Sequence, residues 1–192
     1  MTTMLLPTPR TAQSVPRPLH WTCAEFHRFG DMGAFEGRHA MLIDGVIWEE
    51  GPMNPPHAIT LELVEAALRT VFGSGWRIRS QSPLVLGEDL DPEPDFAVVA
   101  GAPRGSTGHP TTADLVVEVA DSSIDFDTND KRLLYAKAGI REYWVVDINA
   151  RRLLVYRNPQ TGDFANQQSL GSGDTITPLA STGAVQVADL LP

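Results

Sequence analysis

Glu118 lies inside the apolar run LVVEVA, residues 115–120, which has the composition of a buried strand. An ionised carboxylate loses its hydration in such surroundings, and this costs several kcal/mol unless another group pairs with it. A second acidic residue, Asp95, follows Pro94 at the head of the apolar segment DFAVV. If the two segments are neighbouring strands, both carboxylates meet at one end of the sheet. Two close carboxylates raise each other's pKa unless a cation lies between them, so the pattern predicts a metal site.

The chemistry that such a site supports is the hydrolysis of a phosphate ester. Mg²⁺ binds one or two carboxylates and keeps several waters, which suits phosphate chemistry. A nearby lysine can orient or deprotonate the attacking water, or stabilise charge that develops on the phosphate. Lys131 is the candidate, because it lies in the first turns of the helix expected after the Glu118 strand.

Each of these residues also has a purely structural interpretation. Asp95 suits the start of a strand, and Glu118 suits a buried glutamate bonded to backbone amides. Lys131 suits a solvated helix position, and His57 a surface or packing position at a helix start. It is their combination and order that favour a functional site. Three nearby aromatic residues are interpreted as core: Tyr135, Tyr143 and Trp144.

The elements that would position these residues alternate between helix and strand. Thr22 with Glu25 has the spacing of a capping box, Asp44-Gly45 suits a hairpin turn, and Asn54 can cap the clearest helix, which Gly73 or Gly75 stops. Helices are predicted at 22–32, 54–73 and 128–139, and strands at 76–80, 95–100, 114–120 and 184–187, with two more strands joined at 149–150. This order predicts an α/β fold with a mixed sheet.

Composition bounds the class of protein. The chain has 192 residues, of which 42% are hydrophobic and 20% charged, as in a globular domain with its own core. Cys23 is the single cysteine, which excludes a disulfide framework. We expect a flexible arm at residues 1–20, a single domain at 21–192, no signal peptide, no membrane span and a cytoplasmic location.

The formal net charge of −9 argues against a wide, sequence-independent nucleic-acid surface, though not against a local basic patch. The residues available for phosphate contacts are Arg77, Arg79, Arg104, Lys137 and Arg141.

Several stretches together resemble a known family. The run DLVVEVADSS, followed by DTNDKRLLYAKAGIREYWVVDINARRLLVYR and preceded by PDFAVV and LIDGVIWEEGPMNPPHAI, is similar to the Uma family of restriction-endonuclease-like proteins, within the PD-(D/E)XK nuclease superfamily. The resemblance covers Thr22 to the C-terminus and is most specific over Lys131–Asp147. It implies a restriction-endonuclease-like fold: a mixed central sheet flanked by helices, with additional β-hairpins.

The resemblance also implies roles for individual residues. Asp95 would be the acidic residue of the "PD" element and Glu118 that of the "E-x-K" element, both as metal ligands. Position 120 is alanine, so the superfamily lysine is absent from its usual strand position, and Lys131 on the following helix would replace it. His57 matches a family histidine that would contact substrate or water.

One position departs from the family pattern. Members often carry a glutamate just before the LIDG segment, where this chain has Met41. If that glutamate completes the metal site, this chain would bind metal more weakly or use Glu36, Glu49 or Glu50 in its place.

The resulting hypothesis is an endonuclease that uses Mg²⁺ or Mn²⁺ to hydrolyse phosphodiester bonds of nucleic acid, with DNA as the expected substrate and a homodimer as the expected assembly. Two alternatives stay open. The fold could serve as a catalytically inactive, dimeric binding or accessory module, which Met41 and the net charge of −9 favour. The site could also hydrolyse a different phosphate ester.

Overall fold

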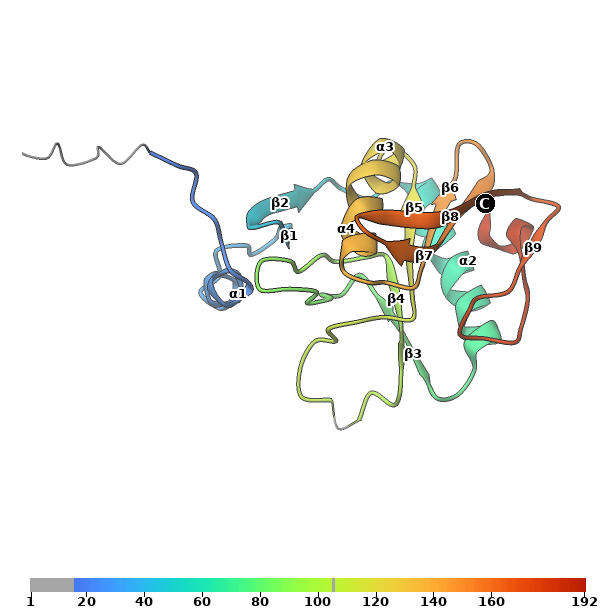
Figure 1. The fold of residues 1–192 in the computed structure, drawn as a ribbon, viewed down its shortest axis with the longest axis horizontal. Helices are drawn as coiled ribbons and strands as arrows, with labels where there is room; N and C mark the ends of the chain where they lie inside the picture. The colour runs from blue at the N-terminus through green and yellow to red at the C-terminus, as the bar shows by residue number, and fades with distance from the viewer. Residues whose placement is uncertain (1–15, 105) are drawn as a thin grey trace, which may run out of the picture.

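The computed structural model describes residues 16–104 and 106–192, so most of the predicted arm at 1–20 lies outside the described residues. Its centre is a six-stranded sheet in the order β3-β4-β5-β6-β7-β8 (Figure 1). The strands are β3 (Trp76–Ser80), β4 (Phe96–Ala100), β5 (Leu115–Ala120), β6 (Glu142–Asp147), β7 (Arg152–Gln160) and β8 (Asp163–Gly171).

The sheet is mixed, as predicted. Neighbouring strands are antiparallel except for β5 and β6, which run parallel. A parallel pair requires a crossover, and here the chain crosses through three short consecutive helical segments: α3 (Ile124–Phe126), a π-helical turn η1 (Asp127–Lys131) and α4 (Arg132–Lys137). The crossover therefore places helical residues directly beside the end of β5.

Alternating side chains of the strands divide the core between the two faces of the sheet. On one face, Phe96 and Val98 pack with residues of α2 (Pro55–Phe72). On the other, Ala97 and Val99 pack with residues of α4. Every residue of β5 and β6 is buried, which explains why both read as almost continuous apolar runs. Glu118 belongs to the α4 face, because Val117 and Val119 point to the α2 face.

A first helix and a hairpin precede α2, and they pack against each other and against the loop before β4. Helix α1 (Cys23–Asp31) begins at the predicted capping box, in which Thr22 and Glu25 bond each other's backbone. Strands β1 (His39–Ile43) and β2 (Val46–Glu50) form a hairpin around Asp44 and Gly45, both with positive φ. A bridge between Leu42 and Asp91 ties the hairpin to the loop before β4.

The observed boundaries differ from the predicted ones in two places. The crossover helix begins at Ile124 instead of Thr128. Strand β8 was not predicted, because most of its side chains are exposed and polar and show no alternation. The remaining C-terminal elements are β9 (Thr175–Ile176), β10 (Val185–Gln186) and a 3₁₀ turn η2 (Val187–Leu190).

The predicted α/β class with a mixed, helix-flanked sheet and additional hairpins is confirmed. None of the described helices combines the length and the apolar character needed to cross a membrane.

Candidate active site

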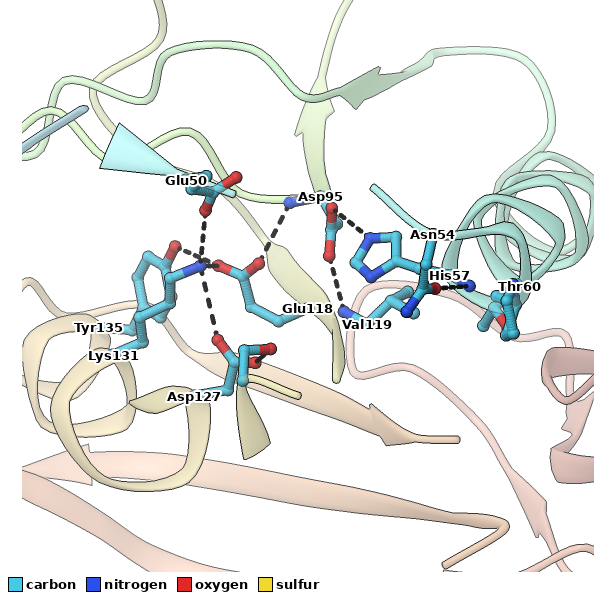
Figure 2. Close-up of polar contacts among 12 residues, drawn as sticks. Glu50, Asn54, His57, Thr60, Asp95, Glu118, Val119, Asp127, Lys131 and Tyr135 are labelled. Atoms are coloured by element: carbon cyan, nitrogen blue, oxygen red, sulfur yellow. Dashed lines mark hydrogen bonds and ion pairs between the residues drawn. The ribbon is translucent and has the colours of Figure 1, made fainter. Parts of the chain in front are cut away.

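The register of β4 and β5 brings Asp95 and Glu118 together. Phe96 pairs with Val117, so one step further along the ladder places Asp95 beside Glu118. The amide of Asp95 donates to Glu118 Oε2 at 3.3 Å, and the amide of Val119 donates to Asp95 Oδ2 at 2.8 Å (Figure 2). The Glu118 carboxylate is thus held by the backbone of Asp95, and the Asp95 carboxylate by the backbone of the residue after Glu118. Both carboxylates line a pocket of about 320 Å³.

Lys131 and Tyr135 are the partners of Glu118. Lys131 Nζ lies 3.0 Å from Glu118 Oε1, and the Tyr135 hydroxyl donates to the same oxygen at 2.8 Å. The Lys131 side chain is only 5% exposed, so it is not a solvated helix lysine. Tyr135 is a core residue, as predicted, but its hydroxyl also orients the candidate metal ligand, a contact that was not predicted from the sequence.

The π-helical turn places a further carboxylate in the pocket. Asp127 Oδ1 lies 3.5 Å from Lys131 Nζ, and Ser123 donates to Asp127 Oδ2 at 2.6 Å. Thr128 and Asn129 donate side-chain hydrogen bonds to backbone carbonyls four residues earlier, a competition that distorts regular helices. Asp127 was not predicted as a site residue, although its spacing of four from Lys131 on a helix was a usable signal.

His57 enters from the first turn of α2. The Asn54 side chain caps this helix, because its Oδ1 accepts from the His57 amide at 3.0 Å. This orientation leaves His57 Nε2 at 3.3 Å from Asp95 Oδ1. The hydrogen bond to Asp95 raises the pKa of His57, against the opposing effect of burial. The four site residues expected from the sequence therefore meet in one pocket.

The hairpin supplies a carboxylate near the position of the missing family glutamate. Met41 pairs with Trp48, and Glu50 pairs with His39 on the same face of the hairpin. Glu50 Oε1 lies 3.6 Å from Lys131 Nζ. Of the other two glutamates considered from the sequence, Glu49 also lines the pocket but is paired with Arg38 at 3.1 Å, and Glu36 is exposed outside the pocket.

Negative charge exceeds positive charge in this cluster. The carboxylates of Glu50, Glu118 and Asp127 surround the single ammonium of Lys131. Burial raises the pKa of Glu118 to about 8, although Lys131 opposes the shift and Asp95 adds to it. Burial lowers the pKa of Lys131, but the surrounding carboxylates outweigh burial and hold it above its ordinary value.

These residues fit a hard divalent cation. Across residues 16–104 and 106–192, no three His, Cys, Asp or Glu side chains converge closely enough to form a complete ligand set. Mg²⁺ does not require one, because it uses one or two carboxylates and completes its shell with water. Within the described residues, the buried Asp127 Oδ1 accepts no hydrogen bond and has only the ion-pair contact of 3.5 Å with Lys131 Nζ, so this oxygen could also bind an added cation or its water.

Comparisons with known proteins identify the family and a similar fold. A family model, Uma2, described as "Putative restriction endonuclease", matches residues 23–189. A crystal structure described as "a putative nuclease belonging to DUF820 from Anabaena variabilis" is similar in fold, with a TM-score of 0.64 and 18% sequence identity; the similarity covers 79% of this chain and 88% of that chain. A search of curated proteins gives no match.

Proposed function

The chain belongs to the Uma2 family, and from this premise we propose that it is a Mg²⁺- or Mn²⁺-dependent endonuclease that hydrolyses phosphodiester bonds of DNA. One observation carries the proposal: two carboxylates from adjacent strands and a buried lysine line the same pocket. Neutral packing would stabilise this core better than a buried cluster of charges, so the cluster is more readily explained by chemistry than by stability.

Asp95 and Glu118 would hold the metal ion, which when bound acidifies a water and neutralises charge on the scissile phosphate. The chain's own hydrogen bonds prepare these ligands. The amides of Asp95 and Val119 and the hydroxyl of Tyr135 fix the carboxylate orientations. Such supporting bonds keep the ligands in place without reorganisation during the reaction.

Lys131 acts as a fixed ammonium in this mechanism. Glu118, Asp127 and Glu50 lie 3.0, 3.5 and 3.6 Å from its Nζ, so it stays protonated and does not serve as a general base. Its charge stabilises the negative charge that develops on the phosphate as water oxygen bonds to phosphorus and the opposite P–O bond breaks. His57, hydrogen-bonded to Asp95, is positioned to contact the attacking water or the substrate.

Two arginines of the edge strand, Arg77 and Arg79, line a hollow separate from the carboxylate pocket, and we propose that they contact further phosphates of the substrate. Arg77 and Arg79 pair with Val99 and Ala97, so both side chains belong to the sheet face that carries Glu118. Their hydrogen bonds go to Ser106, to the Pro83 carbonyl and to His109, and within the described residues neither arginine forms an ion pair with a carboxylate. Burial and the charge of Arg77 lower the pKa of Arg79, as expected for adjacent cations that lack a counter-charge.

The test is metal-dependent cleavage of closed circular DNA, both a supercoiled duplex plasmid and a single-stranded circle. We expect cleavage with Mg²⁺ or Mn²⁺, none with a chelator, and a loss of at least about a hundredfold in Asp95→Asn. Asp114→Asn, just before the opposite end of β5, is the matched control and should cut normally. Intact circles with every metal would contradict the proposal.

That negative outcome would favour the second candidate, a catalytically inactive and dimeric binding module. Met41 is the observation in its favour, because the family pattern often has a glutamate there. Glu50 partly compensates for this difference, since its carboxylate lies in the same pocket.

The raised pKa of Glu118 predicts how metal binding depends on pH. With a pKa of about 8, this carboxyl carries a proton at neutral pH that the metal must displace. The apparent Mg²⁺ affinity should therefore rise by up to about tenfold per pH unit from pH 6 towards 8, and level off above. Calorimetric titration in buffers of different ionisation enthalpy measures the proton release directly. Glu118→Gln should lose this release. Equal affinity of the wild type from pH 6 to 9 would contradict the displacement of a proton from Glu118, and wild-type Mg²⁺ affinity in Glu118→Gln would exclude Glu118 as a ligand.

A further inference from the structure

The pocket that holds the carboxylates has a second, apolar wall. Trp48 lies on the hairpin face that also carries Met41 and Glu50. Its ring centroid is 5.4 Å from that of Phe126, with the two planes tilted by 35°. All four of these residues line the pocket, and Trp48 is 45% exposed although it is large and aromatic.

The apolar wall adjoins the charged one. Lys131 Nζ lies 5.8 Å from the centre of the Phe126 ring and 3.0 Å from Glu118. Met53, 47% exposed, extends the apolar surface at the same pocket. A ligand that reaches the carboxylates therefore meets an aromatic surface in the same pocket. In a nucleic-acid chain, the group next to a phosphate that suits an aromatic surface is a base.

We propose that Trp48 and Phe126 form a stacking platform for an unpaired base, and that the substrate is a single-stranded or locally unpaired nucleic acid. The inference rests on the proposed nuclease function and specifies its substrate. In a duplex, both faces of each base are covered by its neighbours, so Trp48 could stack on a base only after it leaves the helix. In a single strand, each base offers a free face at little cost.

Burial and charge both favour a single strand over a duplex. Glu118 is 2% exposed, so the scissile phosphate must enter the pocket instead of passing along an open surface. A flexible single strand can bend into such a pocket, whereas a stiff duplex resists local bending. Sequence-independent duplex binding relies on many phosphate contacts, and a net charge of −9 opposes the approach of so many phosphates. Base stacking supplies affinity that does not require positive charge.

The experiment compares binding of a fluorescein-labelled single-stranded 12-mer with binding of a hairpin duplex of matched sequence. It uses the full chain carrying Glu118→Gln, with Mg²⁺ present, so that neither substrate is cleaved. We expect tighter binding of the single strand and a loss of roughly tenfold in its affinity in Trp48→Ala. Trp48→Phe should retain most of the affinity, because phenylalanine keeps an aromatic face. Phe29→Ala removes another exposed aromatic side chain, outside the pocket, and should have no effect.

A spectroscopic readout separates stacking from simple packing. Stacking should quench tryptophan emission when the single strand binds, and Trp48→Phe should abolish this quenching. Equal affinity for both DNAs, or an affinity for the single strand that is unchanged in Trp48→Ala, would overturn the proposal. Selective binding that depends on Trp48 would support the stacking platform even if the wild-type protein cuts neither DNA. In that case only the proposed nuclease function would be contradicted. Cleavage of both DNAs at equal rates, unaffected by Trp48→Ala, would remove the stacking platform and leave the nuclease function standing.

Discussion

Glu118→Gln is expected to reduce metal-dependent cleavage by at least about a hundredfold while the fold stays intact. Glutamine keeps the shape of the side chain and an oxygen that can accept from Tyr135, but it cannot carry the negative charge that holds the metal. Because burial raises the pKa of Glu118 above its ordinary value, ionising this carboxyl costs folding free energy in the metal-free protein. Replacing it with a neutral isostere should therefore leave the metal-free melting temperature at pH 7 unchanged or slightly higher.

The measurements are initial rates of circular-DNA cleavage and melting temperatures with and without Mg²⁺. The wild-type protein should gain thermal stability as Mg²⁺ is added, and Glu118→Gln should gain much less, because a ligand stabilises only the state that binds it. Glu65→Gln, on α2 outside the pocket, serves as the matched control. Wild-type cleavage rates in Glu118→Gln would remove this residue from the mechanism.

Lys131→Met is expected to abolish cleavage and also to destabilise the protein by about 3–5 kcal/mol at pH 8. Methionine fills a similar volume but removes the one ammonium that lies among the carboxylates of Glu118, Asp127 and Glu50. An unpaired buried charge is costly, so the remaining carboxylates must repel one another or take up protons.

The pH dependence of this effect follows from the direction of the pKa shifts. Burial raises the pKa of both Glu118 and Asp127, so the buried carboxylates are protonated more readily than in the unfolded chain as the pH falls. The repulsion is thereby relieved, and the loss of stability in Lys131→Met should be larger at pH 8 than at pH 5. Lys131 itself is charged in both folded and unfolded chains across this range, because its folded pKa lies above its ordinary value.

Urea unfolding at pH 5 and pH 8 measures this difference. Lys137→Met is the matched control, because Lys137 lies at the end of α4, which directly follows the turn that carries Lys131, but is 75% exposed, with only a distant contact of 3.8 Å to Asp44. It should change the free energy of unfolding by no more than about 0.5 kcal/mol. Mg²⁺ should restore part of the stability of Lys131→Met without restoring cleavage. Wild-type stability at pH 8 would contradict the idea that Lys131 neutralises this cluster.

Local patterns in the sequence determined most of the secondary structure. Asn54 and Gly73 delimit α2 as predicted, Asp44 and Gly45 form the hairpin turn, and Thr22 caps α1. These features depend on interactions between residues a few positions apart, which the sequence displays directly. Strand β8 lacked such a signal, because it is an edge strand with a mostly exposed, polar surface and is defined by its pairing with β7.

The sequence also identified the residues of the candidate site, but not how they meet. Asp95 and Glu118 are 23 residues apart, and only the register of β4 against β5 makes them neighbours. A shift of one residue in that register would turn one carboxylate to the opposite face of the sheet. Asp127 and Glu50 join the cluster through the π-helical turn and the hairpin, whose positions depend on packing across the pocket.

The sequence by itself determined which segments form helices and strands, and it marked Glu118 as a charge that needs a partner. The tertiary structure decided which partner it has, because Lys131 and Tyr135 reach it only when the crossover helix packs on the α4 face of the sheet. Local propensities act between near neighbours in the chain, whereas the position of a charge in a pocket depends on contacts between distant segments, and these exist only after the chain has folded.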